Sequence, residues 1–93
     1  MLTCEGGRCA LQGPITMQNV TAVLEESARV FSGEHVVVDL SGVTEVDSSA
    51  VSLLLEWRRE AARANRRVEF ANLPGSLKTL AELYGVSELL DPR

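Results

Sequence analysis

The sequence has few of the residues from which metal and redox sites are built. Its 93 residues include one histidine, His35, and two cysteines, Cys4 and Cys9. Two thiols with no histidine nearby do not complete a zinc site, so no metal site is expected. Because disulfides are rare in the cytosol, we expect both cysteines to be reduced and to behave as small, half-buried hydrophobic residues.

Long apolar runs and positive charge are also scarce. No run approaches the roughly 20 residues that span a bilayer, and residues 1–13 lack the basic start and apolar stretch of a signal peptide. We therefore expect a cytoplasmic chain that does not insert into a membrane. Nine basic residues against 13 acidic ones give a net charge of −4. This balance argues against nucleic acid as a partner, since affinity for phosphate depends on Lys and Arg.

What remains is the composition of one folded domain. Hydrophobic residues make up 45% of the chain and charged residues 24%, values that exclude a disordered chain. A chain of this length can build one modest hydrophobic core, so we expect a single domain over residues 1–93.

No group of residues has the spacing of a catalytic site. In a catalytic triad His35 would have to serve Ser48, but the strand between them separates the two by roughly 16 Å. His35 is better explained as a histidine on the surface or at the edge of a strand. The run 74–78 lacks the spacing of a phosphate-binding loop. We expect no catalytic residue and no cofactor, and therefore a protein that is not an enzyme.

The chain is expected to begin with a β-hairpin. Residues 2–5 and 8–11 flank Gly6-Gly7, a two-residue turn that is typical of this motif. Gly13-Pro14 is expected to break the chain after the second strand. The register of the hairpin pairs three sets of residues: Leu2 with Leu11, Cys4 with Cys9, and Glu5 with Arg8. This register brings the two cysteines close enough to oxidise, so a disulfide between them stays open as the alternative to two free thiols.

Alternating helices and strands follow the hairpin. Three consecutive valines at 36–38 indicate a central strand that is covered on both faces, and strand–helix–strand units imply parallel pairing. The expected fold is therefore α/β, a small mixed sheet of about four strands in the order β-β-α-β-α-β-α. The expected elements are a helix over 17–32 with Thr16 as N-cap, a strand over 35–40, a loop over 41–47, a helix over 48–64, a strand over 67–71, a helix from Pro74 to Tyr84, and a short turn over 87–92. The expected core positions in the first helix are Val20, Leu24, Ala28 and Phe31, with Met17 and Val23 beside this stripe. In the third helix they are Leu77, Leu80, Ala81 and Tyr84.

The helix over 48–64 is apolar around more than half of its circumference. Its apolar residues cover about 200° of arc, whereas packing one face on a sheet needs little more than about 100°. The rest of the apolar arc must be covered either by neighbouring elements of the fold or by a partner protein, and the sequence does not decide between these two. Because Trp57 lies at the edge of the arc, it belongs either to the core or to such an interface. Arg58 projects inside the arc, where it must reach solvent along its stem or meet a carboxylate.

Asp47 and Ser48 stand where a loop turns into this helix. A side-chain oxygen at such a position caps the helix by accepting hydrogen bonds from its first amides. The helix start also favours an anion, so a phosphate on Ser48 would meet backbone N–H groups, although Glu45 and Asp47 would oppose it. A signalling role for Ser48 therefore stands beside the structural one.

The stretch 36–49 resembles the signature of STAS domains, the sulfate-transporter and anti-sigma-factor-antagonist family. It consists of an apolar strand, the residues 39–41 (Asp-Leu-Ser), and a loop that ends in Asp47, Ser48 and Ser49 before a long apolar helix. The resemblance runs from the hairpin to Tyr84 and is fairly specific, because element order, length and loop motif agree. It implies the STAS fold.

Residues 80–86 resemble one branch of this family, the B component of the Mla lipid-asymmetry transporter. The resemblance implies a stand-alone accessory subunit that binds the cytoplasmic ATPase of an ABC transporter. That transporter moves phospholipid between the inner membrane and the periplasm and maintains outer-membrane asymmetry. The chain would thus be peripheral to the inner membrane through its partner. Asp47 and Ser48 match the positions that matter there for assembly or activity.

The alternative branch is the anti-sigma-factor antagonist. There a partner kinase, which is also the anti-sigma factor, phosphorylates the serine that follows the loop aspartate. The matching residue is Ser48. Ala50 stands where that branch usually has glycine, and the first strands are shorter than in typical antagonists. Both differences favour the transporter branch.

One flank of the helix over 48–64 carries Ser48, Ser52, Leu55 and Arg59. We expect the third helix to lie alongside this flank and the partner to bind there, with Ser48 at the edge of the contact. Ser48→Asp is then expected to weaken the complex, because it places a carboxylate in a desolvated contact.

Overall fold

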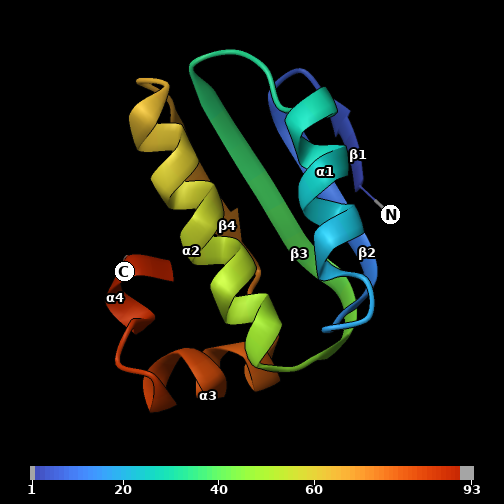
Figure 1. Ribbon diagram of the computed structural model, residues 1–93, viewed down its shortest axis with the longest axis vertical. Helices are drawn as coiled ribbons and strands as arrows, with labels where there is room; N and C mark the ends of the chain where they lie inside the picture. Colours follow the sequence, from blue (N-terminus) through green and yellow to red (C-terminus); the bar gives the residue numbers. More distant parts are fainter. Residues whose placement is uncertain (1, 91–93) are drawn as a thin grey trace.

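The computed structural model describes residues 2–90, which form a sheet of four strands with helices packed on one side (Figure 1). The strand order is β1-β2-β3-β4, with β1 and β2 antiparallel and the other neighbours parallel. The mixed α/β sheet of four strands is as predicted. The elements are β1 (Leu2–Glu5), β2 (Arg8–Ile15), α1 (Val20–Val30), β3 (His35–Val46), α2 (Ser48–Arg63), β4 (Arg67–Ala71), α3 (Gly75–Leu83) and α4 (Ser87–Leu90).

The β1–β2 hairpin has the predicted register, but its cysteines are not reduced. Gly6 and Gly7 have φ angles of +61° and +83°, as a type I′ turn requires. Cys4 and Cys9 lie directly opposite each other, with Cα atoms 4.0 Å apart, and are joined in a disulfide. The expectation of two free thiols was wrong because it rested on the cellular compartment and gave too little weight to this proximity.

β2 and β3 are both longer than predicted. β2 continues through Gly13-Pro14 to Ile15, and β3 continues through residues 41–46, where a loop was expected. The two extensions pair with each other, and register shifts between Ala10 and Gln12 and between Gly13 and Ile15 accommodate the proline. Neither extension could be predicted from its own residues, because each is a strand only through its pairing with the other.

The sheet is covered by helices on one face only, so the prediction of a strand covered on both faces was wrong. Val36 and Val38 face the helices and have no exposed surface, whereas Val37 faces the opposite side and is half-buried. On that side Val37 lies between Arg8 of β2 and Glu69 of β4. Two of the three valines are therefore buried, as the prediction required. The third, Val37, is flanked by long polar side chains and is not covered by a helix.

α1 begins three residues later than predicted, and its N-cap is Asn19, not Thr16. The backbone N–H of Thr16 donates to Asn19 Oδ1 (2.9 Å), and Asn19 Nδ2 donates to the carbonyl of Pro14 (2.8 Å). These bonds hold residues 16–19 as a turn. The buried residues of α1 are Val23 and Ser27, whereas Ala28, expected in the core, is exposed.

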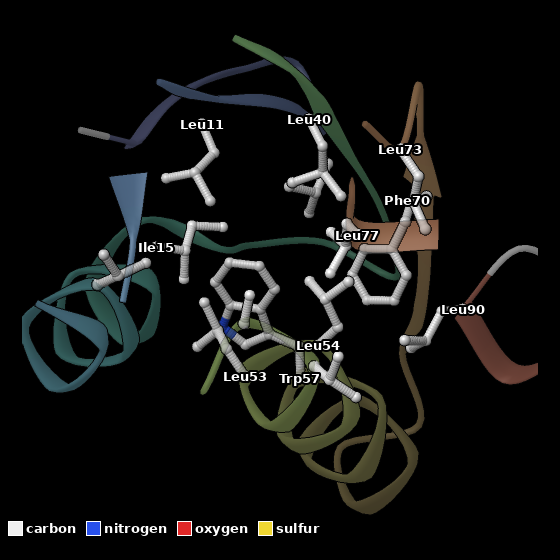
Figure 2. Packing of buried hydrophobic residues seen from close by; sticks show 14 of the residues in the cluster. Leu11, Ile15, Leu40, Leu53, Leu54, Trp57, Phe70, Leu73, Leu77 and Leu90 are labelled. Carbon is white, nitrogen blue, oxygen red and sulfur yellow. The ribbon is translucent and has the colours of Figure 1, made fainter. Parts of the chain in front are cut away.

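α2 provides the centre of the core, and other parts of the chain cover most of its wide apolar arc, although Leu55 is only half-buried and Ala62 is exposed. It contacts α1, β4, α3 and α4. Trp57 is core, with 2% of its surface exposed (Figure 2). Its ring centroid lies 5.2 Å from that of Phe31 and 6.3 Å from that of Phe70. Arg58 is exposed and has no ion pair with residues 2–90, so it reaches solvent.

α3 runs from Gly75 to Leu83, one residue shorter at each end than predicted, with Pro74 as its N-cap and Tyr84 as its C-cap. Gly85 has φ +73°, and the N–H of Val86 bonds back to the carbonyl of Ala81 (2.9 Å), the pattern of a Schellman cap. Tyr84 was expected in the core but is 53% exposed, because it lies beyond the last turn that packs on α2. The expected turn over 87–92 is the helix α4 as far as Leu90, and its last two residues lie outside the described part.

Candidate functional site: the start of α2 and the α1–α2 groove

Asp47 connects the start of α2 to the turn before α1. Its Oδ1 accepts from the backbone N–H of Ser49 (2.9 Å) and from the hydroxyl of Ser49, and its Oδ2 accepts from the backbone N–H of Met17 (3.1 Å). The hydrogen bond from the Ser49 hydroxyl, followed by that from Met17, lowers the pKa of Asp47 below its ordinary value. Asp47 is therefore the N-cap of α2 and the residue that fixes the position of Met17.

Ser48 is the first residue of α2, and its side chain is exposed. Its hydroxyl makes no hydrogen bond to residues 2–90. The capping role belongs to Asp47 and Ser49, so the Ser48 hydroxyl has no part in holding the helix start. It is free to contact a partner or to accept a phosphate group.

A groove of about 430 Å³ lies between α1 and α2. Three of the predicted partner-binding residues, Ser52, Leu55 and Arg59, line it together. Ser48 lies one turn before Ser52 on the same flank. The residues that line this α1–α2 groove are Val20, Thr21, Leu24, Ser52, Leu53, Leu55, Glu56 and Arg59.

The second wall of the groove is α1 and not α3, which is where the prediction differs from the structure. α3 does contact α2, but it buries Leu77 and Ala81 away from this flank. The sequence predicted the flank correctly because helical spacing determines it. It could not predict which neighbour faces the flank, since that depends on the packing of the whole sheet.

The floor of the α1–α2 groove is apolar and one end is charged. Leu24 and Leu55 are half-buried in it. At the charged end Glu56 pairs with Arg59 and also lies 3.4 Å from Arg63 Nη2. Arg59 therefore has an ion-pair partner within α2, which it shares with Arg63, whereas the apolar floor is only partly covered by the chain.

Met17, like Ala28 and Tyr84, is exposed where the sequence predicted a position in or beside the core. It was expected beside the core stripe of the first helix, but it is 77% exposed, in the turn that Asp47 holds. Its backbone N–H is held by Asp47, the residue before Ser48, while its side chain remains exposed. No sequence signal identifies it, because its exposure follows from the late start of α1.

His35 was the remaining candidate for chemistry. His35 is exposed at the start of β3, with its Nε2 3.3 Å from Glu69 Oε2, in agreement with the surface position predicted for it. Within residues 2–90 no cluster of His, Cys, Asp and Glu has the arrangement of a metal site. The same residues contain no helix long and apolar enough to cross a bilayer.

A family model described as "Mlab, STAS domain" matches residues 3–91. The chain belongs to the STAS family. No curated protein matches it. Among solved structures, the STAS domain is similar to the anti-sigma factor antagonist SpoIIAA in its unphosphorylated form, with 19% identity and a TM-score of 0.74 over 97% of this chain and 84% of that one.

A second similarity is to one part of a longer protein, Mglu. Two structures of Mglu match this STAS domain with 28% and 25% identity and TM-scores of 0.63 and 0.54. They cover 81% and 78% of this chain but only 20% and 23% of the Mglu chains. The same fold thus occurs as a module within a larger polypeptide, whereas the match to SpoIIAA spans most of both chains.

Proposed function

We propose that this STAS domain is a non-enzymatic accessory subunit that binds the cytoplasmic ATPase of a phospholipid-transporting ABC complex. That complex would maintain the lipid asymmetry of the outer membrane, and the chain would be cytoplasmic and peripheral to the inner membrane. The family match to the Mla type of STAS domain supports this choice of partner.

The observation that carries the proposal is the free surface built around Asp47. This residue holds the backbone of Met17, whose side chain is exposed, beside the start of α2, where Ser48 is also exposed. Ser48 precedes Ser52 by one turn, and Ser52 lines the α1–α2 groove together with Leu55 and Leu24. A surface with an apolar centre and a polar rim is the usual composition of a protein contact.

The second candidate is an anti-sigma factor antagonist that is switched by phosphorylation of Ser48. Its support is the exposed Ser48 hydroxyl without a hydrogen-bond partner in residues 2–90, together with the fold that the chain shares with SpoIIAA. A phosphate there would lie near Asp47 and Glu45, whose charges disfavour it.

The test is a pull-down from native lysate with wild type, Ser48→Asp and Ser76→Asp, read by mass spectrometry. Ser76 is an exposed serine in the first turn of α3, so its variant adds the same charge to a helix start away from the groove. We expect wild type and Ser76→Asp to recover an ABC ATPase and Ser48→Asp to lose it.

The other outcomes are equally informative. Recovery of a small kinase-like anti-sigma protein, with phosphate on Ser48, would establish the second candidate in place of the first. Recovery of the ATPase at equal yield by all three forms would keep the transporter subunit but remove Ser48 from the contact.

A further inference from the structure

The disulfide between Cys4 and Cys9 joins two strands that are already paired. Glu5 and Arg8 close the two-residue turn, and the cysteines form the next pair of the antiparallel ladder. In a two-residue hairpin that next pair exchanges no backbone hydrogen bonds, and its side chains lie closest together. The bond therefore forms without rearrangement of the hairpin.

The bond closes a loop of only six residues, 4–9. Such a short loop removes little entropy from the unfolded chain, so the disulfide adds less to global stability than one that closes a long loop. Its main effect is local, because β1 is an edge strand of four residues that pairs only with β2. The disulfide is a second covalent link between this edge strand and β2, in addition to the two-residue turn that joins them.

The two sulfur atoms differ in their surroundings. Cys9 is buried, with 2% of its surface exposed, whereas Cys4 is half-buried. A small hollow of about 90 Å³ is lined by both cysteines and by the turn glycines. A thiolate can approach Cys4 from this hollow, and the buried Cys9 would then be the leaving thiolate.

We infer that Cys4–Cys9 is a reversible redox site that responds to a dithiol reductant and controls the attachment of β1. One thiolate of the dithiol attacks Cys4 and forms a mixed disulfide, and Cys9 leaves as a thiolate and takes up a proton. The second thiol of the dithiol then displaces Cys4. The reductant ends as a disulfide and the protein as two thiols, so two electrons and two protons have passed to the protein.

The consequence of reduction is a looser edge of the molecule. Without the covalent bond, β1 is held by its backbone pairing with β2 and by the burial of Leu2, which is 4% exposed. α1 packs against β1 and is also one wall of the α1–α2 groove. The inference of a redox site therefore does not depend on the proposed function. If the proposed function is correct, however, reduction would also loosen the support of α1, which forms one wall of the groove where the partner is proposed to bind.

The test uses the full chain equilibrated with glutathione buffers of graded ratio, and with dithiothreitol as the dithiol. Alkylation of the quenched samples counts free thiols, and amide hydrogen exchange is measured on the oxidised and reduced forms. We expect a single transition from no alkylated thiols to two, and exchange at residues 2–5 that is at least about tenfold faster after reduction. Residues 36–40 of β3 provide the internal control, with unchanged exchange.

The variant Cys4→Ser/Cys9→Ser should exchange like the reduced wild type in every buffer. If this variant does not fold, the comparison of reduced and oxidised wild type still decides the matter. Two alkylated thiols in fully oxidised glutathione would overturn the inference, and so would equal exchange of residues 2–5 in both forms. Neither readout depends on a partner protein, so these outcomes are separate from the failure of the proposed function.

Discussion

The indole Nε1 of Trp57 donates a hydrogen bond of 2.8 Å to Ser27 Oγ, from α2 to α1. The Ser27 hydroxyl in turn donates a hydrogen bond of 2.6 Å to the carbonyl of Leu24 in the same helix. Both residues are 2% exposed, so the bond lies in the core. It fixes the spacing of the two helices that form the α1–α2 groove.

Ser27→Ala is expected to destabilise the fold by about 1–3 kcal/mol, because it leaves the buried indole N–H without an acceptor. Ser32→Ala, on an exposed serine after α1, should stay within about 0.5 kcal/mol of wild type. Urea unfolding followed by circular dichroism measures both. In the double variant with Trp57→Phe, the loss from Ser27→Ala should shrink, since no donor is left unpaired. An undiminished loss in that background would show that Ser27 stabilises the fold without its hydrogen bond from Trp57, through packing and its bond to the carbonyl of Leu24.

The hydrogen bonds around Asp39 indicate that the folded protein loses stability in acid. Asp39 Oδ1 accepts from the N–H of Ser41 (2.9 Å) and from Asn72 Nδ2 (3.1 Å), and Arg8 lies 3.3 Å from Asp39 Oδ2. These bonds, that from Ser41 above all, lower the pKa of Asp39 from 3.8 to about 2. Since the folded pKa is the lower one, the stabilisation is complete above about pH 4 and is lost as pH falls toward 2.

The urea midpoint of wild type should therefore fall between about pH 4 and pH 2 more steeply than that of Asp39→Asn. Glu25→Gln, which removes an exposed carboxylate on α1, is the control and should follow wild type. Parallel curves for wild type and Asp39→Asn would show that the network around Asp39 does not distinguish its two protonation states.

Gly42 is required by the close approach of β2 and β3. A Cβ atom on Gly42 would lie 2.9 Å from Gln12 Cγ and 3.2 Å from the carbonyl oxygen of Leu11. Gly42→Ala should thus cost about 1–3 kcal/mol in urea unfolding. Gly75→Ala is the matched control, because a Cβ atom on Gly75 would have no neighbour within 4 Å, and it should be neutral or stabilise by up to about 1 kcal/mol. Equal effects would show that the two strands separate readily at this point.

The sequence predicted the parts of the fold whose signals lie among a few neighbouring residues. Gly6-Gly7 set the hairpin register, Asp47 marked the start of α2, and β4 was predicted with its observed bounds. The extensions of β2 and β3 were missed because each depends on pairing with the other. Propensity at Gly13-Pro14 argued against a strand, and tertiary pairing overrode it.

The candidate site was predicted to a similar extent. Helical spacing placed Ser52, Leu55 and Arg59 on one flank, and the structure brings them together. The opposite wall of the groove, α1, could not be predicted. Its orientation depends in part on the buried Ser27, and a serine indicates a core position only once its hydrogen-bond partner, Trp57, is known. Met17 was missed for the same reason, since its exposure depends on where α1 begins.

Met17 provides the sharpest test of where the partner binds. If Met17 is buried at the contact with the ATPase, Met17→Ser should weaken binding by at least about tenfold, the cost of losing a buried methionine side chain. Leu83→Ser is the matched control, because Leu83 is 74% exposed, close to the 77% of Met17, and lies at the far end of α3. Binding is measured by titration calorimetry with the ATPase recovered in the pull-down.

The reverse result has a definite meaning. Leu83, Tyr84 and Leu89 are the other large hydrophobic residues exposed within residues 2–90, and they come from α3 and α4 or the residues between them. Weak binding by Leu83→Ser with full binding by Met17→Ser would move the contact to that end of the molecule. The α1–α2 groove would then be a feature of packing, and the hydrogen bond from Met17 to Asp47 would serve only to hold the turn before α1.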